Sequence, residues 1–153
     1  RYLLARLAQH VDLAFSGVKV PGSLEPYTTL EIEHILPDTP TDELRAAWAA
    51  GNPEALYDDY KTRLGNLTLL EKPHNIIAGN NFYAEKLKIY RDCNNYLTRS
   101  MAGLATIGQN SSVSRINEKL AAFPTWDAAT IDKRHALLMA LAQDIWKTNA
   151  IDV

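Results

Sequence analysis

Residues 28–37 read TTLEIEHILP and residues 64–70 read LGNLTLL, and these two stretches decide the fold. Apolar and polar residues alternate along the first stretch, which puts Ile32 and His34 on one face of a strand that Pro37 ends. The second stretch is dense in apolar residues and suits a half-buried partner strand. We therefore predict that the two stretches are short strands that pair as one small β-hairpin.

Helical spacing of apolar residues dominates the rest of the chain. Between the two strands, Thr39 and Pro40 begin a helix that Gly51 ends, and a second helix begins at Asn52 and ends near Lys61. Further helices are predicted over residues 2–15, 75–92, 95–106 and 130–147, together with one that opens at Ser111 or Ser112.

The expected fold class is mostly α (α+β). A small β-hairpin plus helix, a ββα core over about residues 28–92, is embedded in a helical remainder of residues 1–16 and 94–148. The chain has 153 residues, of which 46% are hydrophobic and 22% charged, as expected for one globular domain over residues 1–153. Because it begins at Arg1 inside a helical pattern, we expect it to be excised from a longer protein.

Cysteine content and hydropathy exclude several classes of protein. The single cysteine, Cys93, rules out an internal disulfide and a structural zinc site built on cysteines. No apolar run approaches the roughly 20 residues that span a bilayer, so we expect no membrane partner. Both features suit a cytoplasmic protein.

Charge is unevenly distributed along the chain. The net charge is −2, yet residues 61–99 hold seven Lys and Arg against three Asp and Glu, a net of +4. A basic segment in an acidic protein can hold a phosphate backbone, although a solvated helix face is the simpler interpretation. Lys86, Lys88 and Arg91 recur at near-helical spacing and are the candidate DNA-binding residues.

Three polar positions next to the predicted strands carry the chemistry. Glu33 and His34 stand at the end of the first strand, Asn66 lies in the second, and Asn75 begins a helix. A neutral imidazole can take a proton from water, and carboxylate and amide oxygens suit a hard divalent ion. Strand, strand and helix are therefore expected to form a cradle for one such ion, with open positions for water and a substrate phosphate.

The motif pair EHILP and LGNLTLL, followed by Asn75, resembles the HNH (His-Me finger, ββα-metal) nuclease motif. More narrowly, it is similar to the C-terminal nuclease domain of GmrSD-type, modification-dependent restriction endonucleases. The resemblance extends from about Thr28 to Lys147 and includes Phe82 with Lys86 and the later Trp126.

The resemblance implies a role for each site residue. His34 matches the general base, and Asn66 matches the asparagine that holds the histidine and its loop through hydrogen bonds. Asn75 matches the last metal ligand, while Glu33 occupies a ligand position where Asp or His is more usual. His74 is an alternative ligand to Asn75. The implied cofactor is a divalent metal ion, Mg²⁺ first and Mn²⁺ or another ion next, with no structural zinc.

The implied function is a metal-dependent DNA endonuclease that nicks one strand, as the C-terminal part of a prokaryotic restriction or anti-phage defence protein. Its expected partners are double-stranded DNA, modified or foreign, and an N-terminal nucleotide-hydrolysing sensor domain of the parent protein. A homo-oligomer or two sequential nicks would cut both strands. Alternatives remain open: a catalytically silent HNH-like DNA-binding module, a subunit-interaction module, or an enzyme that cuts RNA.

Overall fold

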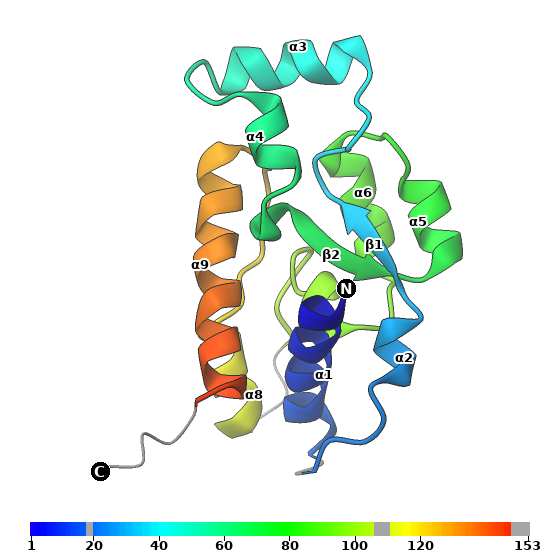
Figure 1. Cartoon of the computed structure of the whole chain (residues 1–153), viewed down its shortest axis with the longest axis vertical. Coiled ribbons are helices and arrows are strands. Elements are labelled where there is room, and N and C mark those ends of the chain that lie inside the picture. The colour runs from blue at the N-terminus through cyan, green and yellow to red at the C-terminus, as the bar shows by residue number, and fades with distance from the viewer. Residues whose placement is uncertain (18–19, 106–110, 148–153) are drawn as a thin grey trace.

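Two short antiparallel strands lie among helices, and the helices on the two faces of this sheet position the site (Figure 1). The computed structural model describes residues 1–17, 20–105 and 111–147. In chain order the elements are α1 (Tyr2–Ser16), α2 (Glu25–Thr28), β1 (Glu31–His34), α3 (Asp42–Gly51), α4 (Tyr57–Lys61), the 3-10 turn η1 (Leu64–Asn66), β2 (Leu67–Leu70), α5 (Lys72–Ala78), α6 (Tyr83–Tyr90), α7 (Tyr96–Arg99), α8 (Ser111–Asn117) and α9 (Ala128–Ile145).

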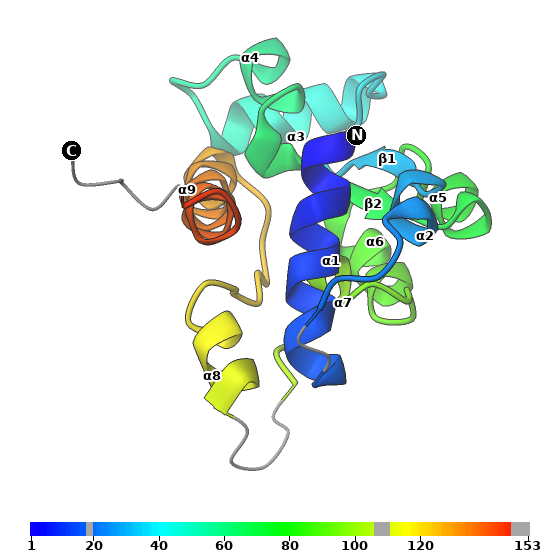
Figure 2. The same cartoon turned by 60° about the horizontal axis from the view of Figure 1, so that its bottom comes forward.

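The register of the sheet determines which side chains lie on each of its two faces. Ile32 pairs with Leu69 and His34 with Leu67, whereas Glu33 pairs with Thr68 on the opposite face. Antiparallel partners share a face and neighbours along a strand alternate. One face therefore meets the core of α1, while the other meets α5 and α6 (Figure 2).

Buried apolar residues form clusters that keep both faces dry. Leu69 packs with Leu4, Leu7 and Val11 of α1 in the first cluster. Leu70, the next residue, packs instead with buried residues of the second cluster, among them Tyr90. The successive leucines of LGNLTLL thus anchor β2 to helices on opposite sides.

The structure confirms the mostly α, α+β fold class and both predicted strands, with local corrections. The second strand begins at Leu67, so Asn66 lies in η1 and not in a strand, and the helix expected from Asn52 begins at Tyr57 as α4. The helix expected over residues 75–92 is broken into α5 and α6, because Gly79 adopts a positive φ of 43° that ends α5. The helix expected over residues 95–106 is the single turn α7, and residue 106 lies outside the described residues. Thr41, not Thr39, caps α3 through a bond from the Leu44 N–H.

Within residues 1–17, 20–105 and 111–147, no helix is both long and apolar enough to cross a membrane.

Gly65→Ala is expected to lower the free energy of unfolding by about 3 kcal/mol, since overpacking has few ways to relax against backbone. A Cβ at Gly65 would overlap the Ile131 carbonyl oxygen and lie 2.9 Å from the His135 nitrogen in α9. Urea denaturation followed by circular dichroism measures the change. Gly51→Ala is the matched control, because a Cβ added there meets no atom within 4 Å apart from its chain neighbours and the backbone of its own helix; equal stability of the two variants would contradict the expectation.

Candidate functional site

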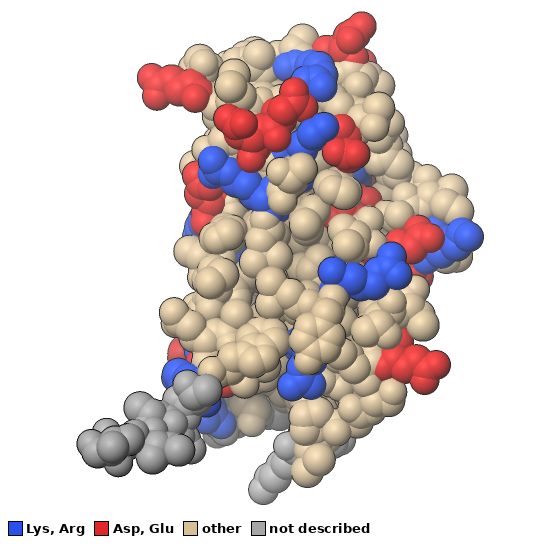
Figure 3. Space-filling model, viewed as in Figure 1, with Lys and Arg blue, Asp and Glu red and all other residues tan. Residues whose placement is uncertain are grey.

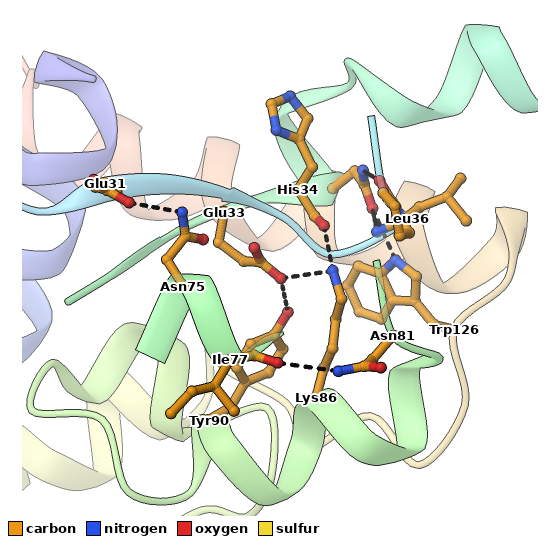
Figure 4. Close-up of polar contacts among 12 residues, drawn as sticks. Glu31, Glu33, His34, Leu36, Asn75, Ile77, Asn81, Lys86, Tyr90 and Trp126 are labelled. Atoms are coloured by element: carbon orange, nitrogen blue, oxygen red, sulfur yellow. Dashed lines mark hydrogen bonds and ion pairs between the residues drawn. The ribbon is translucent and has the colours of Figure 1, made fainter. Parts of the chain in front are cut away.

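Strand β1 divides the candidate residues between its two faces. Glu31 and Glu33 point towards α5 and α6, and the His34 ring points away from them (Figure 4). This follows from the two-residue period of a strand. The structure therefore brings Glu33 and Asn75 together, but it does not gather His34 into one cradle with them as the sequence led us to expect.

Glu33 is buried and held by two donors. Its Oε1 accepts a hydrogen bond from Lys86 Nζ at 2.8 Å and another from the Tyr90 hydroxyl at 2.7 Å. Burial raises the pKa of Tyr90 well above its ordinary value, with the Glu33 charge adding to the effect, so the phenol remains a neutral donor. Because both donors bond Oε1, the other carboxylate oxygen, Oε2, is the one available to a ligand.

Lys86 has a different place from the one predicted. Its side chain is 0% exposed, and its ammonium also donates to the His34 carbonyl oxygen at 2.8 Å. Burial lowers the pKa of Lys86, while the adjacent Glu33 carboxylate opposes that shift. A fully buried ammonium cannot reach a DNA phosphate on the surface, which corrects the predicted phosphate contact.

The side-chain amide of Asn75 lies beside the Glu33 carboxylate (Figure 4). Its Nδ2 donates to Glu31 Oε2 at 2.9 Å, and this bond fixes the orientation of the amide. Its Oδ1 is buried and has no hydrogen-bond partner, and it is turned towards Glu33 (Figure 4). Buried polar atoms are almost always satisfied, so this oxygen is free to bond a water molecule or a ligand. His74, the alternative, instead pairs with Glu71 at 3.0 Å.

Asn66 ties the two strands together at the end of β1. Its Oδ1 accepts from the Leu36 N–H at 2.7 Å and from the Trp126 indole at 2.9 Å. Its Nδ2 donates to the carbonyl oxygens of Leu36 and Lys61 at 2.9 and 2.8 Å. Asn66 is 0% exposed, so it positions the loop that follows His34 and does not itself meet a substrate.

Arg134 of α9 holds the backbone on either side of Asn66. Its Nη1 donates to the carbonyl oxygens of Gly65 and Leu67, the residues on either side of Asn66, at 2.7 Å each. Burial lowers the pKa of this guanidinium to about 10, so Arg134 is a cation at neutral pH. The 3-10 turn that carries Asn66 is thereby fixed to α9.

Tyr90, Trp126 and Arg134 are the site residues that the sequence analysis missed. Lys86 and Tyr90 stand four apart on α6 and so share a helix face, a signal that was available. Trp126 and Arg134 lie 60 and 69 residues from the groups that they bond, Asn66 and Gly65. Their apolar and helical context gave no sign of those partners.

The exposed basic candidates stand on α6 and just after it. Lys88 is 68% exposed and pairs with Glu85, and Arg91 is exposed at the end of the helix. On the face seen in Figure 3, Lys and Arg are interspersed with Asp and Glu and form no continuous basic stripe.

An apolar pocket of about 260 Å³ opens beside the loop after β1. Leu36, Trp48, Phe82 and Trp126 are among its walls, and none of Glu33, His34 or Asn75 lines it. The pocket is therefore separate from the polar site. Within the part of the chain that the structure describes, no group of three or more His, Cys, Asp and Glu side chains could hold a metal ion.

The fold and the site together define a mostly helical protein built on a small ββα unit with a buried carboxylate and amide beside β1. The chain belongs to the family of C-terminal domains of GmrSD restriction endonucleases, whose family model matches residues 1–141. It is accordingly a nuclease domain of the restriction type, as the motif resemblance indicated. The match also includes α1, which lies outside the predicted region of similarity. No curated protein and no solved structure matches the chain.

Proposed function

We propose that this domain is an HNH-type, metal-dependent endonuclease that nicks one DNA strand at each site. The observation that carries the proposal is the buried, unpartnered Oδ1 of Asn75, which is turned towards the Glu33 carboxylate. The match to restriction endonucleases supports DNA as the substrate.

The residues present fit a hard divalent ion. Glu33 Oε2 and Asn75 Oδ1 are oxygen donors of the kind that Mg²⁺ and Mn²⁺ prefer. Glu31 orients Asn75, and Lys86 with Tyr90 orients Glu33; outer partners of this kind commonly set the direction of metal ligands. When bound, such an ion polarises the phosphate and stabilises the departing oxygen.

His34 is the proposed general base. In-line displacement at phosphorus needs the attacking water and the leaving oxygen on opposite sides of the phosphate. His34 and the Glu33–Asn75 pair point to opposite faces of β1, which is compatible with a phosphate lying across the end of that strand. There the imidazole takes a proton from the attacking water, while Asn66 holds the adjoining loop at Leu36.

Lys88 and Arg91 are the proposed contacts to the DNA backbone, since both side chains are exposed. We place the domain in the cytoplasm of a prokaryote, as the cutting part of a longer defence protein whose other region senses DNA. Cleavage of both strands then requires a second copy or a second nick.

Supercoiled plasmid incubated with Mg²⁺, Mn²⁺ or EDTA tests the proposal. We expect open circles with either metal and none with EDTA. Asn75→Ala and Glu33→Gln are each expected to reduce nicking about 100-fold or more, as loss of a charge-stabilising group typically does. Metal-dependent nicking that both variants retain would refute the assignment. Intact plasmid together with salt-sensitive DNA binding would favour the silent DNA-binding module.

A further inference from the structure

We propose that Lys86 is a positioning residue that holds Glu33 in an internal ion pair, so that the divalent ion binds together with DNA and not before it. This inference rests on the function proposed above. It concerns the net charge of the Lys86–Glu33 pair before DNA binds.

The burial of Lys86 is specific to this site. Its ammonium is 0% exposed and lies 2.8 Å from Glu33 Oε1, whereas Lys88, two residues further on, is 68% exposed. A buried charge is tolerated only when it is paired and hydrogen-bonded. Among the described residues, Glu33 is the carboxylate that pairs with this ammonium, so the two charges cancel inside the domain.

The same contacts orient the candidate ligand oxygens in advance. Lys86 and Tyr90 both bond Oε1 of Glu33, which reserves Oε2 for an incoming ion. Glu31 bonds the Nδ2 of Asn75, which reserves Oδ1. The geometry of the two donors is therefore set by contacts among β1, α5 and α6 and does not require the metal.

The charge of the groups around these two oxygens, by contrast, does not favour tight metal binding in the absence of DNA. Mg²⁺ takes about six oxygen ligands and usually shares them among carboxylates, water and substrate phosphates. Here Lys86 neutralises the Glu33 carboxylate, and the second donor, the Asn75 amide, is uncharged. The Glu31 carboxylate keeps its charge, but its oxygen bonds the Nδ2 side of that amide. A DNA phosphate would supply both a further oxygen and a further negative charge. Metal and DNA should then raise each other's affinity by the same factor, as linkage requires.

The coupling can be measured on a chain that cannot cut. In the His34→Ala variant, isothermal titration calorimetry gives the Mn²⁺ affinity with and without a short DNA duplex. We expect the duplex to tighten Mn²⁺ binding about tenfold or more, within the usual range of such couplings. Gel-shift titration should show DNA affinity rising by the same factor when Mn²⁺ is added.

Lys86→Met in the same background isolates the role of the ammonium. Removing a like charge beside the ion is expected to raise the Mn²⁺ affinity without DNA by roughly tenfold, and to shrink the coupling. Lys133→Met is the matched control, since it removes an exposed ammonium of α9 outside the candidate site and should leave Mn²⁺ binding unchanged. Lys86→Gln keeps a hydrogen-bond donor at neutral charge and replaces Lys86→Met if that variant fails to fold.

Two sets of results would separate this inference from the proposed function. Equal Mn²⁺ affinity with and without the duplex, or Lys86 variants that bind Mn²⁺ no better than Lys133→Met, would overturn the inference while wild-type nicking leaves the function intact. Absence of Mn²⁺ binding under every condition, together with no nicking by the wild-type chain, would overturn the proposed function itself.

Discussion

His34→Ala is expected to reduce plasmid nicking by about 100- to 10,000-fold, the usual contribution of a general base. The ring is half-buried at the end of β1, and its backbone carbonyl, not its imidazole, bonds Lys86. The substitution should therefore leave the Lys86–Glu33 pair and the fold in place. Initial rates of open-circle formation at saturating Mg²⁺ measure the effect, and thermal unfolding checks that the variant is folded.

His10→Gln is the matched control for this prediction. His10 is a half-buried histidine of α1 and lies outside the candidate site, so its replacement should leave the nicking rate near that of the wild type. His74→Ala distinguishes the two candidate ligands, because a rate close to wild type would favour Asn75 over His74. A His34→Ala variant that nicks as fast as the wild type would remove His34 from the mechanism.

Asn66→Ala is expected to lower the free energy of unfolding by about 4 kcal/mol, since each buried group left without a partner costs about 1–3 kcal/mol. The substitution removes the hydrogen-bond partner of four buried groups: the Leu36 N–H and carbonyl oxygen, the Lys61 carbonyl oxygen and the Trp126 indole. For a domain of this size the melting temperature should fall by about 10 °C. Nicking should fall as well at temperatures where the variant is still folded, because the loop after His34 loses its anchor.

Asn66→Asp and Asn80→Ala are the comparison variants for this prediction. The aspartate keeps the oxygen that accepts from Leu36 and Trp126 but loses both donors and buries a charge, so it should not restore stability. Asn80 is exposed, and its replacement should change the melting temperature little. If Asn66→Ala melts within a degree or two of the Asn80 variant, the bonds to Asn66 do not hold the loop.

The elements of this fold that depend on neighbouring residues were predictable, whereas those that depend on distant contacts were not. The strand that holds His34, the strand that follows Asn66 and the helix that contains Asn75 were predictable, because alternation and helical spacing are properties of neighbouring residues. The break between α5 and α6 was missed, although Gly79 stands at it with a positive φ. Such a break depends on how both helices pack and not on periodicity alone.

The burial of Lys86 could not be predicted from the sequence. In the sequence Lys86 is one of several basic residues at helical spacing, and a solvated or DNA-facing role was the natural prediction. In the structure it is fully buried against a carboxylate 53 residues away. Burial and charge pairing are properties of the packed molecule, so spacing along α6 cannot distinguish Lys86 from exposed Lys88.

The α+β fold class, the family and the identities of the polar residues at the end of β1 follow from residue type and local order along the chain. Three features depend on packing: His34 and Glu33 point to opposite faces, Asn75 keeps an oxygen without a partner, and Lys86 is an internal counter-charge. The physical reason is that a buried polar group takes its role from the partners that packing brings to it.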